Sequence, residues 1–198
     1  MLTKIVAKNF KRLDQIEVEL GDVVVFIGPN NGGKTSALQA LLLWHAGLLT
    51  WSKERRSKTA EKRPGVTLPR LGLTQVPVAD AKHLWRHLRV RNVSRDDAGK
   101  QQTDNILIDI TVEGERSGVA WKCGLEFDYA NPESFYCRPL RHGDGRMPVP
   151  DLAKEEKIHL LPPLSGVSTE EPELQTGRVN VLLGHVDKLL THNLADAM

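Results

Sequence analysis

Alternating apolar and polar side chains at the start of the chain predict two short β-strands. Residues 2–8 and 15–20 both follow this alternation, and the polar residues Lys11, Arg12 and Asp14 lie between them. Successive side chains of a strand point to opposite faces, so this alternation indicates strands with one buried face. We expect the two segments to form an antiparallel pair.

A continuous apolar run follows directly. Gly21 and Asp22 predict a turn into residues 23–27, which are all apolar and mostly β-branched. This is the pattern of a strand that is buried on both faces. From residue 34 to 46 the apolar positions recur at helical spacing without a proline, which predicts a helix. The pattern therefore predicts a buried strand, a glycine-rich loop and a helix in succession.

The next part of the chain interrupts this order. Residues 50–77 are basic, poor in apolar side chains and punctuated by prolines, so we expect an exposed excursion. A short helix is expected over residues 79–88. Residues 92–104 are polar again, with a turn near Asp96 and Asp97.

Alternation returns in the second half and predicts a β-layer over residues 105–140. Residues 106–112 and 119–127 form a good hairpin pair around the turn sequence EGERSG, and residues 134–140 predict a third strand. A strand is also expected over residues 157–161. An apolar stripe at helical spacing predicts a C-terminal helix over residues 179–195.

Composition narrows the class of protein only slightly. The chain has 27 Lys and Arg residues against 25 Asp and Glu residues, so its total charge indicates no particular partner. Cys123 and Cys137 have no CxxC spacing and therefore predict neither a zinc site nor a redox motif. No apolar run approaches the roughly 20 residues that a membrane-spanning helix needs. We expect a cytoplasmic protein of 198 residues in one domain, without a membrane partner.

One motif carries specific chemistry. The sequence GPNNGGKT at residues 28–35 satisfies the phosphate-loop pattern G-x-x-x-x-G-K-[ST] at every fixed position. Triphosphate oxygens need several converging N–H donors, which a backbone wrapped around them supplies. Gly28 and Gly33 permit the close approach that a Cβ would block. The helix that follows offers its N-terminal N–H groups and its dipole to the same negative charge. The motif predicts a site for ATP with Mg²⁺.

The side chains of the loop have separate expected roles. Lys34 is expected to contact the β- and γ-phosphates, the Thr35 hydroxyl to bind Mg²⁺, and Ser36 to donate on the α-phosphate side. The full set expected to surround the phosphates is Gly28, Asn30, Asn31, Gly32, Gly33, Lys34, Thr35 and Ser36. The alternative interpretation is an ordinary strand-to-helix turn that favours glycine and asparagine.

No catalytic residue can be assigned by pattern. A hydrolysing P-loop enzyme needs an acidic residue on a second buried strand to hold Mg²⁺. Asp109 in NILIDIT is the best candidate, but its alternating neighbours suit a half-buried hairpin strand better, and Ile110 follows it in place of an acid. The LSG at residues 164–166 is similar to the start of the ABC signature loop LSGGQ. Because Pro172 curtails any helix there, we interpret it as a loop.

The opening of the chain resembles the ABC-type ATPase heads of the SMC, RecF and OLD (overcoming lysogenization defect) group. The resemblance is carried by KNFKRL at residues 8–13, then by IEVEL, by VVVFIGPNNGGKTSALQALLLW, and late in the chain by residues 161–184. It extends over residues 1–45 and 105–195 and does not include the basic excursion. It implies a P-loop lobe of mixed α/β class with α+β character. A buried strand, phosphate loop and helix would lie beside an antiparallel β-layer.

The resemblance also implies functional residues beyond the loop. Such heads often place a basic residue near the nucleotide where Lys11 and Arg12 stand here, and Gln175 lies in a setting similar to that of their glutamine loop. Other glutamines remain open for that role: Gln39, Gln75, Gln101 and Gln102. In this group the signature loop and the catalytic carboxylates lie in a second half. The resemblance therefore implies a missing C-terminal half, or a second head bound through the nucleotide as a homodimer.

The favoured interpretation is thus the ATP-binding lobe of a DNA-associated ATPase in repair, chromosome maintenance or phage defence. Two alternatives remain open: a compact P-loop kinase with Asp109 on Mg²⁺, and a non-catalytic module that senses nucleotide. A kinase requires parallel strands joined by crossover helices. The basic residues 53–63 are a candidate contact for DNA phosphates, and a solvated loop is the alternative explanation for them.

Overall fold

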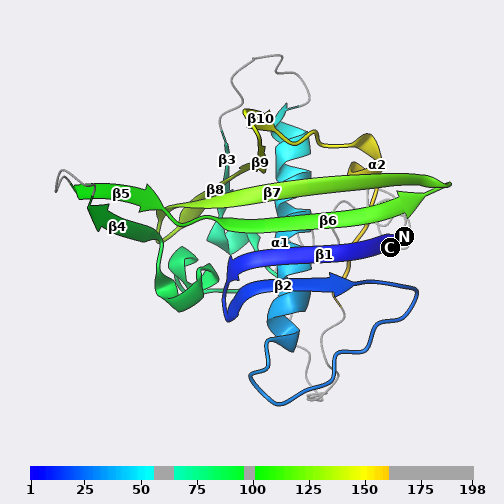
Figure 1. Cartoon of the computed structure of the whole chain (residues 1–198), viewed down its shortest axis with the longest axis horizontal. Coiled ribbons are helices and arrows are strands. Elements are labelled where there is room, and N and C mark those ends of the chain that lie inside the picture. Colours follow the sequence, from blue (N-terminus) through cyan, green and yellow to red (C-terminus); the bar gives the residue numbers. More distant parts are fainter. Residues whose placement is uncertain (56–64, 96–100, 161–198) are drawn as a thin grey trace, which may run out of the picture. The chain divides into compact units, whose positions relative to one another are not determined.

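The largest element of the fold is a six-stranded antiparallel sheet that the long helix α1 (Lys34–Arg55) crosses on one face (Figure 1). The computed structural model describes residues 1–55, 65–95 and 101–160. The order of strands in the sheet is β2-β1-β6-β7-β8-β3. These strands are β1 (Leu2–Phe10), β2 (Leu13–Glu19), β3 (Val66–Pro69), β6 (Ile108–Arg116), β7 (Val119–Asn131) and β8 (Ser134–Pro139). Every pairing between them is antiparallel.

The expected hairpins form as the alternation predicts. The β1–β2 pair and the β6–β7 pair are both present, and β8 is the expected third strand. Two residues with positive φ, Ser117 (52°) and Gly118 (78°), connect β6 to β7. Positive φ at both central residues is the signature of the tight turn that matches the twist of a hairpin. The antiparallel β-layer expected over residues 105–140 is therefore confirmed.

Helix α1 packs on the sheet face that carries the apolar side chains. The rings of Trp44 on α1 and Trp121 on β7 are stacked 6.2 Å apart, and Trp44 Nε1 donates a hydrogen bond to the Cys123 carbonyl at 3.0 Å. Gly47 allows a close approach, because a Cβ there would lie 2.9 Å from the Cys137 sulfur. This core fixes the axis of α1, and so the place of its N-terminus, relative to the strands.

The other face of the sheet is polar and contains a network of ion pairs. Glu126 on β7 is 3% exposed and accepts hydrogen bonds from Arg138, Arg146 and the Arg141 backbone N–H. Burial raises the pKa of a carboxyl, but these donors outweigh burial and hold the pKa of Glu126 below its usual value. The network anchors the small hairpin of β9 (Arg141–His142) and β10 (Gly145–Arg146). A one-turn helix, α2 (Asp151–Lys154), follows.

A second, separate hairpin is formed by β4 (Arg91–Arg95) and β5 (Gln101–Asn105). No strand was expected over residues 92–104, which are almost entirely polar, so this ribbon was not predicted. The turn expected near Asp96 and Asp97 lies outside the described residues. The short helix expected over residues 79–88 is present as two 3₁₀ turns, Ala81–Leu84 and Arg86–Leu88. None of the helices in the described ranges is long and apolar enough to cross a membrane.

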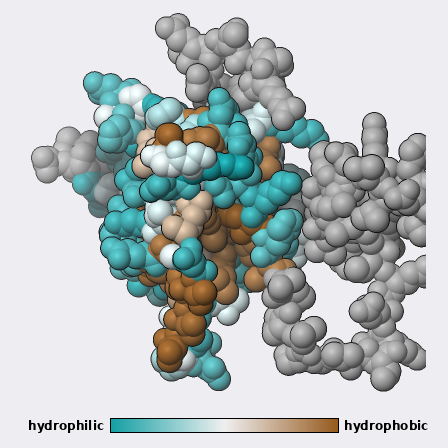
Figure 2. All heavy atoms as spheres, turned by 90° about the vertical axis from the view of Figure 1, so that its right-hand side faces the viewer, coloured by the Kyte–Doolittle hydropathy of each residue, from teal (hydrophilic) through white to brown (hydrophobic). Residues whose placement is uncertain are grey.

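The strand expected over residues 23–27 is absent, and this prediction was wrong for the described chain. The segment has no strand partner, and Val23, Val25 and Ile27 are 83%, 72% and 91% exposed. In Figures 1 and 2 the connection between β2 and α1 forms the lower edge, where hydrophobic residues protrude. A run of β-branched residues predicts a buried strand only when other strands flank it, and no described residue supplies them.

Three further boundaries differ from expectation. Helix α1 extends to Arg55, beyond the expected end at residue 46, and residues 50–55 therefore belong to it and not to an excursion. Residues 66–69 form the edge strand β3, and Leu73 and Val76 are buried, so residues 66–76 do not form the expected exposed excursion. Residues 56–64 lie outside the described residues. Residues 157–160 form no strand. The predictions for residues 164–166, Gln175 and the helix over residues 179–195 lie outside the described residues.

Candidate functional site

The phosphate-loop sequence leads directly into the N-terminus of α1. The first helical hydrogen bond runs from the Ala37 N–H to the Gly33 carbonyl at 2.9 Å, and the helix begins at Lys34. Asn31 and Gly33 both have positive φ, 72° and 88°. Asparagine tolerates this region and glycine favours it, so the NNGG sequence suits the tight curvature of the loop. The first turn of α1 contains no acidic residue that would repel an anion.

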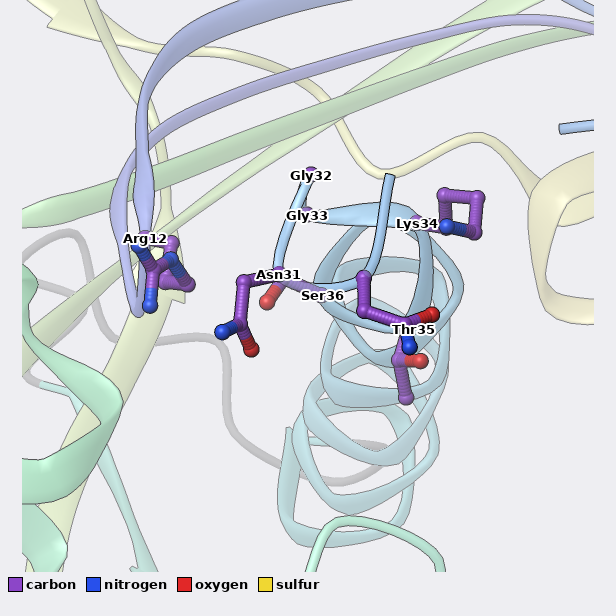
Figure 3. A pocket seen from close by; sticks show the side chains of 8 residues that line it. Arg12, Asn31, Gly32, Gly33, Lys34, Thr35 and Ser36 are labelled. Carbon is purple, nitrogen blue, oxygen red and sulfur yellow. The ribbon is translucent and has the colours of Figure 1, made fainter. Parts of the chain in front are cut away.

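An open polar pocket lies at this helix end. It has a volume of about 230 Å³ and is lined by eight residues: Arg12, Asn30, Asn31, Gly32, Gly33, Lys34, Thr35 and Ser36. Seven of the eight belong to the loop or the first turn of α1. Figure 3 shows Arg12 and Asn31 on one side of the helix end and Lys34 on the other. The structure thus brings the loop residues expected to surround phosphates to one pocket, except that Gly28 is not among the lining residues.

The Lys34 ammonium is bound to the loop itself. Its Nζ donates hydrogen bonds of 2.7 Å to the carbonyl oxygens of Gly28 and Pro29. These contacts are exposed, and carbonyl oxygens are weaker partners for an ammonium group than phosphate oxygens are. Lys34 can therefore exchange the two carbonyls for an anion that enters the pocket.

The turn between β1 and β2 supplies the one lining residue from outside the loop. Arg12 is exposed and forms no ion pair or hydrogen bond within the described part of the chain. Its neighbours are fixed on both sides: Phe10 is fully buried, and Leu13 is 7% exposed. The guanidinium group is therefore held at the pocket by a rigid turn and is free to pair with an anion.

Lys11 does not line the pocket. Its Nζ donates a 2.7 Å hydrogen bond to Gln39 Oε1 on α1, and its backbone N–H donates to the Leu84 carbonyl. Burial lowers the pKa of the Lys11 ammonium. The structure thus separates the two basic residues of the turn, so that Arg12 lies at the pocket and Lys11 ties the turn to the helix.

Two positioning contacts were not predicted from the sequence. The first is the contact of Leu13 with Gly33, which is so close that a Cβ added to Gly33 would lie 3.0 Å from Leu13 Cδ2. Gln39 fixes the turn through Lys11. Gln39 was one of several glutamines left open for another role, and neither spacing nor residue type distinguished it. The two partners of each contact are 20 residues (Leu13 and Gly33) and 28 residues (Lys11 and Gln39) apart in the chain, so these contacts leave no periodic signal in the sequence.

Asp109 lies away from this pocket. Ile108 and Ile110 are fully buried on the face of the sheet that α1 covers, so Asp109 between them lies on the opposite, polar face. Burial, and then the charge of Glu126, raise the pKa of the Asp109 carboxyl. The sheet therefore lies between Asp109 and Thr35, the residue expected to bind Mg²⁺. Together with the antiparallel strands, this position contradicts the kinase alternative for the described residues.

The arrangement fits a polyphosphate. The pocket lies at a helix N-terminus, Arg12 and Lys34 supply positive charge, and no carboxylate lines it. Thr35 is exposed, so its hydroxyl is accessible to a metal ion that also binds phosphate oxygens. Within the described ranges, no cluster of three or more His, Cys, Asp or Glu side chains offers a metal site elsewhere.

Comparison with known proteins agrees with this chemistry. The family model described as AAA ATPase domain matches residues 1–117, which is more than half of the chain and includes the pocket. No curated protein matches the chain. The family is one of nucleotide-binding ATPases, as the phosphate loop predicted. The chain belongs to the AAA ATPase domain family.

Proposed function

We propose that this chain is the ATP-binding and Mg²⁺-binding lobe of an ABC-type ATPase of the SMC, RecF and OLD group. One observation supports the proposal most: the GPNNGGKT sequence leads into α1 and lines a pocket together with an arginine from the β1–β2 turn, and no carboxylate lines that pocket. The strand–NF–basic–strand opening that implied the resemblance builds this turn. Its antiparallel sheet also suits the β-layer of such heads.

Within this proposal the residues have distinct functions. The loop N–H groups and the helix N-terminus bind the β- and γ-phosphates, Lys34 exchanges its carbonyl partners for phosphate oxygens, and Thr35 binds the metal ion. Mg²⁺ supplies charge neutralisation between the phosphates when bound. Arg12 approaches from the side opposite Lys34 and pairs with the remaining phosphate charge.

The direct test is ATP binding by Lys34→Ala, measured by calorimetry with Mg²⁺. Loss of a charge-assisted contact of about 1.5–3 kcal/mol lowers affinity at least tenfold. Lys122→Ala is the matched control, because Lys122 lies in an exposed ion pair with Glu113 on β6 and β7. Equal ATP affinity in the wild type and in Lys34→Ala would remove the site assignment.

We also propose that a C-terminal ATPase half, or a second head, associates with this lobe. Residues 23–27 support this proposal, because they expose an apolar run with no partner among the described residues. Exposed apolar segments of this kind mark sites of association. A complementary half would supply neighbouring strands that pair with residues 23–27 and other elements that bury both faces of this segment.

Replacing Val25 and Ile27 by Thr tests this association. Both side chains are largely exposed, so the free energy of unfolding of the lobe, measured by urea denaturation, should change by less than about 0.5 kcal/mol. Binding of a separately expressed C-terminal ATPase half should be lost, as measured by analytical ultracentrifugation. Val119→Thr, another exposed valine, is the control that retains binding. Unchanged association in the double variant would exclude the segment as the contact.

The cellular setting implied by the resemblance is DNA repair, chromosome maintenance or phage defence. We propose association with DNA as the common feature of these settings. Its support is the resemblance of the opening residues. Its test is whether nuclease-sensitive DNA co-purifies with the protein at low salt, and its absence under those conditions would count against this setting.

A further inference from the structure

The β4–β5 hairpin is a separate two-stranded ribbon, hydrogen-bonded to no strand of the main sheet. All ten residues of its two strands are exposed. Its base is firmly attached: the Ile106 N–H donates to the Val90 carbonyl at 3.0 Å, and Trp85 Nε1 donates to the Ile106 carbonyl at 2.6 Å. In Figure 1 the ribbon extends outward from the side of the sheet where β6 begins and β7 ends. A rigid base with fully exposed strands suits a contact surface better than a structural role.

The two faces of this ribbon differ in charge. Side chains alternate between faces along each strand, and the register pairs Arg91 with Asn105 and Arg95 with Gln101. One face, which we call the arginine face, therefore consists of Arg91, Val93, Arg95, Gln101, Thr103 and Asn105. The only carboxylate on the two strands, Asp104, lies on the opposite face with Asn92, Ser94 and Gln102.

Positive charge continues from the ribbon into the segment before it. Residues 82–95 include five Lys and Arg residues and two His residues but no acidic residue. Lys82 pairs with Asp80, and Arg86 pairs with Asp14. Three arginines remain without an ion pair in the described ranges: Arg89, Arg91 and Arg95. Over residues 82–105 as a whole, six Lys and Arg residues still outnumber three aspartates.

We propose that the arginine face docks into the major groove of duplex DNA. A two-stranded ribbon is one of the two elements that this groove admits. Arg91 and Arg95 are four residues apart, about 13 Å along a strand, which is close to the groove width of about 12 Å. Their guanidinium groups can therefore reach phosphates on both edges of the groove.

The other side chains of the arginine face suit the floor of the groove. Gln101 and Thr103 offer hydrogen-bonding groups that pair with base edges, and Val93 between the two arginines is 58% exposed and can contact a thymine methyl group. A-form RNA has a deep, narrow major groove that side chains do not read, so duplex RNA fits this face poorly. A lipid surface would favour a larger apolar face than one valine provides.

The surface is distinct from the nucleotide pocket, although the two are structurally connected. Phe10 pairs with Trp85 at the base of the segment, and the Lys11 N–H donates to the Leu84 carbonyl. The inference rests on the proposed association with DNA, for which it names the contact surface, and it does not require ATP binding. DNA binding by Lys34→Ala therefore separates a failure of this proposal from a failure of the nucleotide site.

The test measures fluorescence anisotropy of a labelled 20-base-pair DNA duplex with the full chain over a salt series, without nucleotide. Arg91→Gln combined with Arg95→Gln should lower affinity about tenfold and reduce the salt slope by about 2. Arg116→Gln combined with Arg141→Gln removes the same charge at exposed positions outside the ribbon and should leave both quantities nearly unchanged. Lys34→Ala should bind DNA as the wild type does.

A second pair of variants tests the face directly. Thr103→Glu adds an acid to the arginine face, whereas Gln102→Glu adds the same acid to the opposite face at the next position. The proposal requires that Thr103→Glu lower the affinity for DNA at least several-fold more than Gln102→Glu does. Equal losses, no duplex binding, an unchanged affinity of the double arginine variant, or preferred binding to duplex RNA or anionic vesicles would each overturn it.

Discussion

The side chain of Leu13 lies against Gly33, so closely that a Cβ on Gly33 would be 3.0 Å from Leu13 Cδ2. Leu13 belongs to the start of β2, and Gly33 precedes the first residue of α1. The contact therefore joins the strand pair to the phosphate loop. Since Arg12 directly precedes Leu13, the same contact also determines where the arginine meets the pocket.

Gly33→Ala is expected to lower both stability and ATP affinity. The substitution places a Cβ at a φ of 88°, which costs roughly 1–2 kcal/mol, and forces Leu13 to move. We expect a lower urea midpoint and an ATP affinity reduced at least tenfold, measured by fluorescence and calorimetry.

Gly21→Ala provides the matched control for this change. Gly21 has no positive φ and no atom within 4 Å of an added Cβ, so its stability change should stay within about 0.5 kcal/mol. If Gly33→Ala behaved like Gly21→Ala in both measurements, the close contact with Leu13 would have no consequence for the loop.

Substitutions of Arg12 and of Lys11 are expected to affect different properties, the first the affinity for ATP and the second the stability of the fold. Arg12→Gln removes a guanidinium group that has no described protein partner, so ATP affinity should fall about tenfold while the urea midpoint is unchanged. Lys11→Met removes the hydrogen bond to Gln39, so the free energy of unfolding should fall by about 0.5–1.5 kcal/mol, with a smaller effect on the affinity for ATP. The reverse pattern would place Lys11 at the nucleotide.

Much of this fold follows from alternation along the chain. The β1–β2 pair and the β6–β7 hairpin were predictable because apolar and polar residues alternate in each strand. The loop was predictable because its glycines and its lysine are fixed by phosphate chemistry. Arg12 was named from a resemblance, and only the structure distinguishes its position from that of Lys11.

The main failure, residues 23–27, has a physical cause. Sequence reasoning identified an apolar β-branched run and inferred burial, which depends on flanking strands that the described chain does not provide. The β4–β5 ribbon was missed for the opposite reason. Its strands are almost entirely polar and exposed, so they lack the alternation by which strands are recognised.

Asp109→Asn is expected to stabilise the protein in a pH-dependent way. Burial, and then the charge of Glu126, raise the pKa of Asp109, and its Oδ1 is buried without a hydrogen bond. A raised carboxyl pKa in the folded state means that stability is full below the unfolded pKa of about 3.9 and falls as pH rises through the folded value. The variant should therefore exceed the wild type at pH 7, by less than about 1 kcal/mol, and match it near pH 3.

Urea midpoints of the wild type and of Asp109→Asn, measured at pH 3 and pH 7, test the direction of this change in stability. Glu126→Gln is the contrasting variant, because arginine donors lower the pKa of Glu126 and its charge stabilises the fold above its unfolded pKa. That variant should lose stability at pH 7. A loss of stability for Asp109→Asn at pH 7 would mean that its carboxylate has a favourable partner.

The last prediction concerns hydrolysis. Attack on the γ-phosphate needs a group that orients water and added charge stabilisation in the transition state. The pocket provides the loop, Arg12, Lys34 and Thr35, but no carboxylate lines it, and Asp109 lies on the other face of the sheet. Contacts that bind ATP equally in its ground state and transition state give affinity without turnover.

The purified 198-residue chain should therefore bind ATP and hydrolyse it far more slowly than about 1 s⁻¹, the lower end of the ordinary enzyme range. Adding a C-terminal half should raise turnover and promote dimerisation through sandwiched nucleotide. If ATP binding changed dimerisation but no hydrolysis occurred even with the C-terminal half present, the nucleotide-sensing module would be favoured. Turnover of about 1 s⁻¹ or faster by the chain alone, abolished by Asp109→Ala, would contradict the lobe proposal and return the compact enzyme to consideration. Because the sheet separates Asp109 from Thr35, we expect Asp109→Ala to leave the slow basal rate unchanged.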